Sequence, residues 1–167
     1  RFALCAEAAR SAARGEAQVL ITVHPSWADY VAERAPLLDR AAVASNRLVV
    51  LGPSGSEAAR AGTDPAVLLA GGLRSIAVPS TESSAVGMYA REALLRYGIW
   101  SQMQTVLRQT PGSAAALSAL ANGEVDAAIA LASDAVATAQ PVIMTSDSAF
   151  HRPILVEVLL LDDTSSD

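Results

Sequence analysis

Three turns rich in serine and threonine contain the residue types best suited to bind a small anion. They are Ser80-Thr81-Glu82-Ser83-Ser84, Thr110-Pro111-Gly112-Ser113 and Ser133-Asp134, and each precedes or opens a stretch with helical spacing of apolar residues. The first N–H groups of a helix have no partner within it, and its N-terminus has a partial positive charge. Several helix starts at one edge of a sheet would therefore bind an anion without lysine. Each turn taken alone is explained more simply by a hydroxyl that caps its own helix.

The other residues that could do chemistry are not grouped by their spacing. His24 and His151 are distant in sequence from each other and from Cys5, so we expect surface or loop histidines and no metal site. The sequence has no Gly-x-Ser-x-Gly turn and no dinucleotide-binding glycine pattern after a strand. Because no nucleophile and base are brought together, we predict that the chain is not an enzyme.

The charge balance excludes several classes of partner. The 167 residues include 12 basic residues, all of them arginine, and the net charge is −5. Without a basic stripe, neither nucleic acid nor an anionic membrane surface is an expected partner. An anion would have to be held by a local site, since the overall charge does not attract it. The single Cys5 permits no internal disulfide and therefore does not indicate a compartment.

Strand-like and helix-like segments alternate along the chain. No apolar stretch reaches the length of a membrane span, and no signal peptide precedes the abrupt start at Arg1, which we interpret as a fragment or a processed end. The alternation predicts an α/β fold with parallel sheets covered on both faces. Strands are expected at residues 18–23, 47–51, 75–78, 105–108, 125–131, 142–145 and 154–161, and helices at 2–13, 25–33, 64–71, 84–97, 113–122 and from 133.

Several segments across the whole chain keep a common order with few gaps. They are Gln18–Ile21 followed by Trp27-Ala28-Asp29-Tyr30, then Asn46–Val50, Ile76-Ala77-Val78 followed by Gly87-Met88-Tyr89-Ala90, Gly123–Ile129 and Ser133-Asp134-Ala135. This ordered set resembles the periplasmic molybdate-binding proteins of ABC transporters, which are bacterial extracellular solute-binding proteins.

The resemblance implies a type 2 periplasmic-binding fold, in which two α/β lobes have a ligand cleft between them. Residues 1–45 and 139–167 are expected to form the first, incomplete lobe, and residues 46–138 the second. The chain would cross between the lobes twice, and the terminal elements of the family would be missing from this sequence.

The resemblance also implies a ligand, which is a molybdate-like or tungstate-like oxyanion rather than a metal cation or a cofactor. The expected ligand-binding residues are Cys5, Ser83, Ser84, Val86, Ser113 and Leu131. Val86 and Ser113 would donate backbone N–H groups. Cys5 stands where the family has a serine, and Leu131 where it has a tyrosine. Since a thiol is a weak donor and an alkyl group is none, we expect weaker molybdate binding than in a typical member.

These implications describe an extracytoplasmic solute-binding protein that delivers a small oxyanion to the permease of an ABC transporter. We expect a monomer, periplasmic or lipid-anchored outside the cell, without a cofactor. The alternative is a ligand-sensing regulatory domain of the same fold with a different small ligand. A small α/β enzyme is a third possibility, and it would need a convergent nucleophile and base. A signal peptide upstream would favour transport, whereas a helix-turn-helix would favour regulation.

Overall fold

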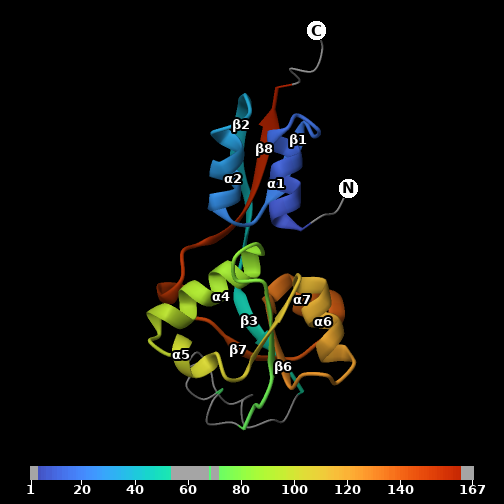
Figure 1. The fold of residues 1–167 in the computed structure, drawn as a ribbon, viewed down its shortest axis with the longest axis vertical. Helices are drawn as coiled ribbons and strands as arrows, with labels where there is room; N and C mark the ends of the chain where they lie inside the picture. Colours follow the sequence, from blue (N-terminus) through green and yellow to red (C-terminus); the bar gives the residue numbers. More distant parts are fainter. Residues whose placement is uncertain (1–3, 54–67, 69–71, 163–167) are drawn as a thin grey trace. The chain divides into compact units, whose positions relative to one another are not determined.

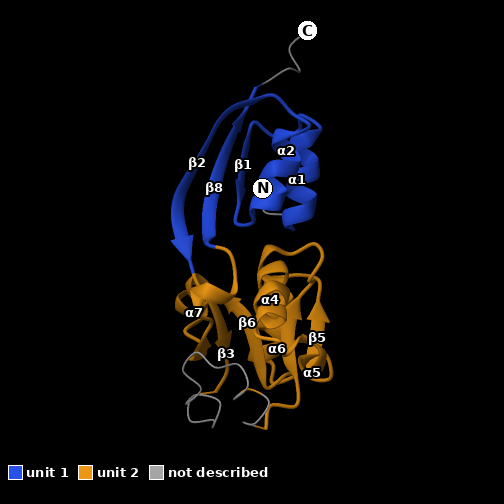
Figure 2. Ribbon diagram, turned by 90° about the vertical axis from the view of Figure 1, so that its left-hand side faces the viewer, with its two compact units in different colours: residues 1–46, 153–167 blue, residues 47–152 orange. Residues whose placement is uncertain are grey.

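The computed structural model describes residues 4–53, Leu68 and residues 72–162, which form two compact units. The first unit contains residues 1–46 and 153–167, and the second contains residues 47–152 (Figure 2). The second boundary therefore lies between 152 and 153, and not between 138 and 139 as the sequence suggested. The reason is a non-local pairing, because the strand at Val142–Thr145 pairs with the strand at Leu48–Leu51 inside the second unit.

The first unit packs two helices against one face of a three-stranded antiparallel sheet. Figure 2 shows both helices on the same side of this sheet. The apolar core lies between the layers and includes Ala9, Val31 and Leu159. The expected parallel sheet is thus wrong for this unit. Its elements are α1 (Cys5–Ala13), β1 (Val19–Thr22), α2 (Pro25–Ala32), β2 (Leu37–Asn46) and β8 (Ile154–Leu161), with strand order β1-β8-β2.

Strand β2 has no counterpart among the predicted strands. Its residues are exposed or half-buried along the whole strand, so it lacks the alternation of buried and exposed positions that marks a strand in a sequence. The strand forms because it pairs with β8 from Leu37 to Asn46, with two irregularities in register. This partner is more than a hundred residues away, and no local pattern identifies it.

The second unit has a mixed five-stranded sheet with strand order β5-β4-β6-β3-β7. Figure 1 labels β3, β6 and β7 of this sheet. β4 is parallel to β5 and β6, whereas β3 is antiparallel to both β6 and β7, so the expectation of an all-parallel sheet is corrected here too. Its elements are β3 (Leu48–Leu51), β4 (Ile76–Pro79), α4 (Ala85–Arg96), α5 (Trp100–Met103), β5 (Leu107–Thr110), α6 (Ser113–Ala121), β6 (Ala127–Leu131), α7 (Ala132–Thr138), β7 (Val142–Thr145) and the 3-10 helix η2 (Ser148–Phe150).

Helices cover both faces of this sheet, as the continuous burial of β6 requires. On one face, Ala128 and Ala130 belong to an apolar cluster with Ala116 and Leu120 of α6. On the other face, Ile129 and residues of α4 line a void of only 20 Å³. The helix predicted at residues 64–71 falls outside the described residues, apart from Leu68. No helix in the described part of the chain is long and apolar enough to cross a membrane.

A carboxylate joins the starts of β4 and β6, at the edge of the sheet opposite to the one where the helices begin. Asp126 Oδ2 accepts hydrogen bonds from Arg74 N at 2.8 Å, Ser75 N at 3.0 Å and Ser75 Oγ at 3.2 Å. The backbone N–H of Arg74 contributes most to lowering the pKa of Asp126 below its ordinary value of 3.8, and the two Ser75 donors lower it further. The interaction links the start of β4 to the start of β6.

The Asp126→Asn variant is expected to unfold more easily at neutral pH by about 1–2 kcal/mol, because donors that now bond to a charged acceptor would bond to a neutral one. A lowered folded-state pKa stabilises the protein at pH values above the unfolded pKa of about 3.8. This stabilisation is lost as the pH falls through the folded value. Urea unfolding from pH 7 to pH 2.5 should therefore show a gap between parent and variant that closes on acidification. Glu124→Gln, which removes an exposed charge two residues away, is the control, and a gap independent of pH would contradict the prediction.

Candidate anion-binding site

The carboxyl ends of three neighbouring strands meet at one edge of the sheet of the second unit. β4 lies between β5 and β6, and Ala77 is opposite Ala128. Continuing this register puts Ser80 level with Leu131, about 4.8 Å away across the sheet. On the other side, Ser80 N donates to Thr110 O at 2.8 Å and extends the pairing with β5. Since α4, α6 and α7 follow these strands, all three helices begin at this edge.

The start of α4 presents three buried N–H groups without an acceptor. Among the described residues, no partner exists for the N–H groups of Ala85, Val86 and Gly87, and the Ser84 hydroxyl does not cap the helix. Ser84 is only 7% exposed and Thr81 only 8%, and neither hydroxyl has a hydrogen-bond partner in the described part of the chain, although both oxygens keep some access to solvent. The N–H groups and hydroxyls of this helix start can therefore bind an acceptor that reaches them from solvent.

The turn before α4 is held by Ser80. Its Oγ accepts from Glu82 N at 3.4 Å, from Ser83 N at 3.3 Å and from the Ser83 hydroxyl at 2.8 Å. Its carbonyl accepts from Ser84 N at 3.0 Å. Of the two serines expected to bind a ligand, Ser83 therefore uses its hydroxyl as a hydrogen-bond donor within the turn. The Ser84 hydroxyl makes no such bond to the described residues.

Gly87 allows α4 to begin in contact with the end of β4. A Cβ at this position would lie 2.2 Å from both Pro79 O and Ser80 O. Any other residue would push the helix start away from the strand. Gly87 was noticed in the sequence only as part of a family-like segment, and its spatial role was missed. A glycine in the first turn of a helix, where it lowers helix propensity, is the signal that could have found it.

The start of α6 is open in the same way. Its N-cap residue Gly112 is extended, with φ −169° and ψ −179°, and provides no side-chain cap. No acceptor is found among the described residues for the N–H groups of Ser113, Ala114 and Ala115. The Thr110 hydroxyl donates to Gly112 O at 3.1 Å and so fixes the turn. Two neighbouring parallel strands thus lead into two uncapped helices.

Two donors at the third helix start are already occupied. Leu131 N donates to the Asp134 carboxylate at 2.9 Å, and Ala132 N donates to Arg47 O at 2.9 Å. Leu131 is 7% exposed, and its side chain has no polar atom. The turn at Ser133-Asp134 was predicted to contribute to an anion site, but here the acidic side chain already occupies the donor of Leu131.

Residues 2–167 match the family described as bacterial extracellular solute-binding protein. The chain belongs to this family. It is 28% identical over 153 residues to the molybdate-binding protein ModA of Escherichia coli K12, covering 87% of this chain and 59% of that protein. The structure of the Azotobacter vinelandii periplasmic molybdate-binding protein is similar with a TM-score of 0.80 and 16% identity, over 98% of this chain and 73% of that one. The structure of PEB3 with bound L-phospholactate is similar with a TM-score of 0.70 and 14% identity, over 99% of this chain and 75% of that one.

Membership of the family confirms the resemblance inferred from the sequence and the predicted α/β periplasmic-binding fold. The chain spans about three-fifths of the length of the curated relative from Escherichia coli.

The structure divides the expected ligand residues between the units. Ser83, Ser84, Val86, Ser113 and Leu131 lie at the edge just described, in the second unit. Cys5 belongs to the first unit, where it is the first residue of α1 and half-buried. Among the described residues, no group of three His, Cys, Asp or Glu side chains could hold a metal ion.

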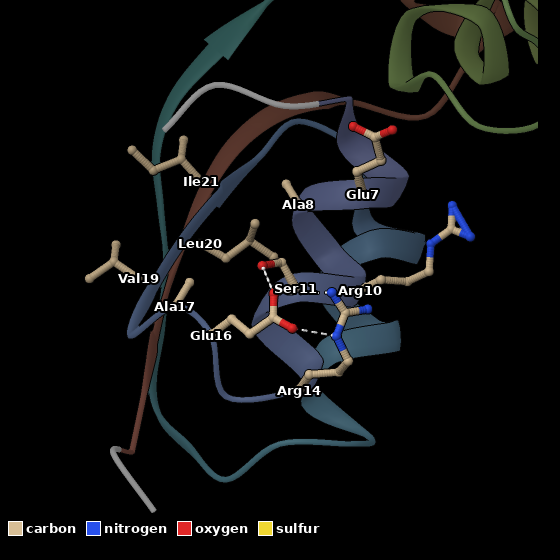
Figure 3. A pocket seen from close by; sticks show the side chains of 10 residues that line it. All are labelled: Glu7, Ala8, Arg10, Ser11, Arg14, Glu16, Ala17, Val19, Leu20 and Ile21. Atoms are coloured by element: carbon tan, nitrogen blue, oxygen red, sulfur yellow. Dashed lines mark hydrogen bonds and ion pairs between the residues drawn. The ribbon is translucent and has the colours of Figure 1, made fainter. Parts of the chain in front are cut away.

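A larger hollow lies in the first unit, between α1 and β1, and has a volume of 780 Å³ (Figure 3). None of the expected ligand residues lines it. Two of its charged groups pair, since Glu16 accepts from Arg14 Nε at 2.6 Å, and Glu16 also accepts from Ser11 Oγ at 2.6 Å. Its floor is apolar and includes Leu20. The size of a hollow therefore does not identify the anion site of this chain.

Both histidines lie in loops, as one part of the expectation had it, but they are buried and not on the surface. His24 is 3% exposed and caps α2, with Nδ1 accepting from Ser26 N at 3.2 Å. His151 is 5% exposed and lies edge-on to Tyr89 of α4, with ring centroids 6.0 Å apart. Histidine is polar and each of the two lies in a loop, so only tertiary packing reveals their burial.

Proposed function

We propose that this chain is the ligand-binding part of an extracytoplasmic solute-binding protein that takes up a small oxyanion for an ABC transporter. The single observation that supports it best is the pair of uncapped helix starts at the ends of β4 and β5. Among the described residues, six N–H groups there lack acceptors, and the hydroxyl of Ser84, a residue only 7% exposed, lacks a partner beside them. The similar proteins named above bind molybdate or an organic phosphate.

The chemistry of this edge suits an anion that must be released again. Backbone N–H groups and the partial charge of a helix N-terminus stabilise a negative charge without an opposing formal charge. The chain has no lysine, and its net charge is −5, so the affinity would depend on these directed donors. A carrier that binds by hydrogen bonds alone can discriminate between oxyanions by the number and direction of their oxygens.

The family supports the proposal of a transporter as partner and of a location outside the cytoplasm, and the monomeric state and the lipid anchor are part of the same proposal. The oxyanion would be handed to the permease of the transporter, and the protein would act as a monomer in the periplasm or anchored by lipid outside the cell. We propose neither a cofactor nor an enzymatic activity, because the anion is the cargo. Nucleic acid is not a proposed partner, since the chain has an acidic balance.

Calorimetric titration with molybdate, tungstate, sulfate and phosphate is expected to show binding of at least one oxyanion. Molybdate should bind about a hundredfold more weakly than to the Escherichia coli relative measured alongside. A thiol at Cys5 and an alkyl group at Leu131 stand where the resemblance expects hydroxyls, and 1.4 kcal/mol corresponds to about tenfold in affinity. Equal molybdate affinity in the two proteins would contradict the expected weakening. Absence of binding by all four anions would contradict the proposed function.

A further inference from the structure

The three helix starts at the edge of the second unit are not equivalent. The N–H groups at the starts of α4 and α6 are open, whereas the start of α7 has the Asp134 carboxylate bonded to Leu131 N at 2.9 Å. A carboxylate at this point repels an anion, and the donor it accepts from is no longer available. An anion at this edge therefore meets the open N–H groups of α4 and α6 on the side of β4 and β5, and the Asp134 carboxylate and the Leu131 side chain at the end of β6.

Leu131 makes the side of β6 apolar. Alternate residues of a strand share a face, so Leu131 lies on the same face as Ile129, which lines a void together with Ala90 and Leu94 of α4. Its pairing partner on the neighbouring strand β3 is Leu48, which is also buried. Leu131 is the last residue of β6, the strand next to β4, and it therefore lies at the edge where α4 begins.

A bare tetrahedral oxyanion does not fit such an edge well, because its oxygens point in every direction. An oxygen facing Leu131 would lose its water without gaining a donor, and this loss weakens binding. An oxyanion with one alkyl substituent directs three oxygens at the donors and a carbon at the leucine. Its oxygens would be satisfied, and its carbon would be removed from water.

We propose that this edge takes a small organic oxyanion, with the oxygens on the N–H groups of α4 and α6 and a short alkyl group against Leu131. The proposal rests on the proposed function, because it assumes that the two helix starts bind an anion. It adds the chemical class of the ligand, which is an alkylphosphonate or a compound of the same shape.

A series of three phosphorus dianions tests the proposal in the unmodified chain. Phosphate, methylphosphonate and ethylphosphonate differ in one substituent, which is hydroxyl, methyl or ethyl. Measured by calorimetry at a pH where each is a dianion, affinity should rise in that order. We expect about fourfold for each carbon, equivalent to about 0.8 kcal/mol per buried CH₂. Equal affinities, or phosphate binding most tightly, would overturn the proposal.

Two variants identify the residue responsible. Leu131→Tyr should reduce the preference for ethylphosphonate over phosphate from about fifteenfold to about unity, since it replaces an alkyl surface by a hydroxyl. Leu95→Tyr makes the same exchange at a position of α4 that is 48% exposed, and should keep the preference. A preference that survives in Leu131→Tyr would overturn the assignment to Leu131.

The Ser113→Pro variant separates failure of this inference from failure of the proposed function. Proline at Ser113 removes an N–H donor and should weaken all three dianions alike. If Ser113→Pro leaves every affinity unchanged, the anion site is elsewhere and this inference fails, whereas the proposed function fails only if none of the anions binds to the parent. If Ser113→Pro weakens binding but the three dianions bind equally in the parent, only the inference about the organic ligand fails.

Discussion

Replacing Gly87 by alanine is expected to destabilise the second unit by about 3 kcal/mol, the upper end of what overpacking usually costs. The added Cβ would lie 2.2 Å from the carbonyl oxygens of both Pro79 and Ser80. Both are backbone atoms, one at the end of β4 and the other in the turn held by Ser80, so neither can rotate away. Relief requires a shift of α4, and that shift moves the N–H groups of Ala85 and Val86 away from the edge. Anion affinity should therefore fall together with stability.

Denaturant unfolding and anion titration measure the two effects of Gly87→Ala. Gly98→Ala is the matched control near the other end of α4, where φ is +75° and a Cβ would meet no atom within 4 Å. It should cost about 1–2 kcal/mol through its left-handed backbone alone and leave anion affinity unchanged. Equal affinity in the parent and Gly87→Ala would show that contact with β4 does not position the helix start.

The sequence was informative where structure is determined by local pattern. The helix at 84–97 and the strand at 75–78 were predicted within one residue of α4 and β4 at each end, because an apolar face at helical spacing and a short buried run are local features. The boundary at 152 was not predictable in this way. It depends on pairing between β3 and β7, whose residues are about ninety positions apart.

The sequence predicted which residue types form the candidate site, but not whether their polar groups are already hydrogen-bonded. The hydroxyl-rich turns identified three helix starts, yet a serine before a helix has the same sequence signature whether or not it caps that helix. The structure separates the cases, since Ser84 has no partner among the described residues while Asp134 accepts from Leu131 N. Gly87 illustrates the same limit. The sequence shows that this residue has no side chain, but it does not show the carbonyl groups that leave no room for one.

Replacing Ser113 by proline is expected to weaken oxyanion binding by about tenfold to a hundredfold while leaving the fold intact. Ser113 is the first residue of α6, a position where proline fits because its N–H would have no partner in the helix. The preceding Gly112 is extended, with ψ −179°, a conformation that a following proline tolerates. The substitution thus removes one donor from the edge without breaking a backbone hydrogen bond of the helix.

Ser113→Ala is the control for the loss of the serine hydroxyl. Alanine removes the hydroxyl but keeps the N–H, so the difference between the two variants measures the backbone donor alone. A hydrogen bond to a charged group contributes about 1.5–3 kcal/mol, which is the basis of the expected change. Calorimetry gives the affinities, and urea unfolding should give a proline variant at least as stable as the alanine variant. If both variants bind as tightly as the parent, neither the N–H nor the hydroxyl of Ser113 contacts the ligand. If alanine accounts for the whole loss, the hydroxyl and not the helix start would be the donor at α6.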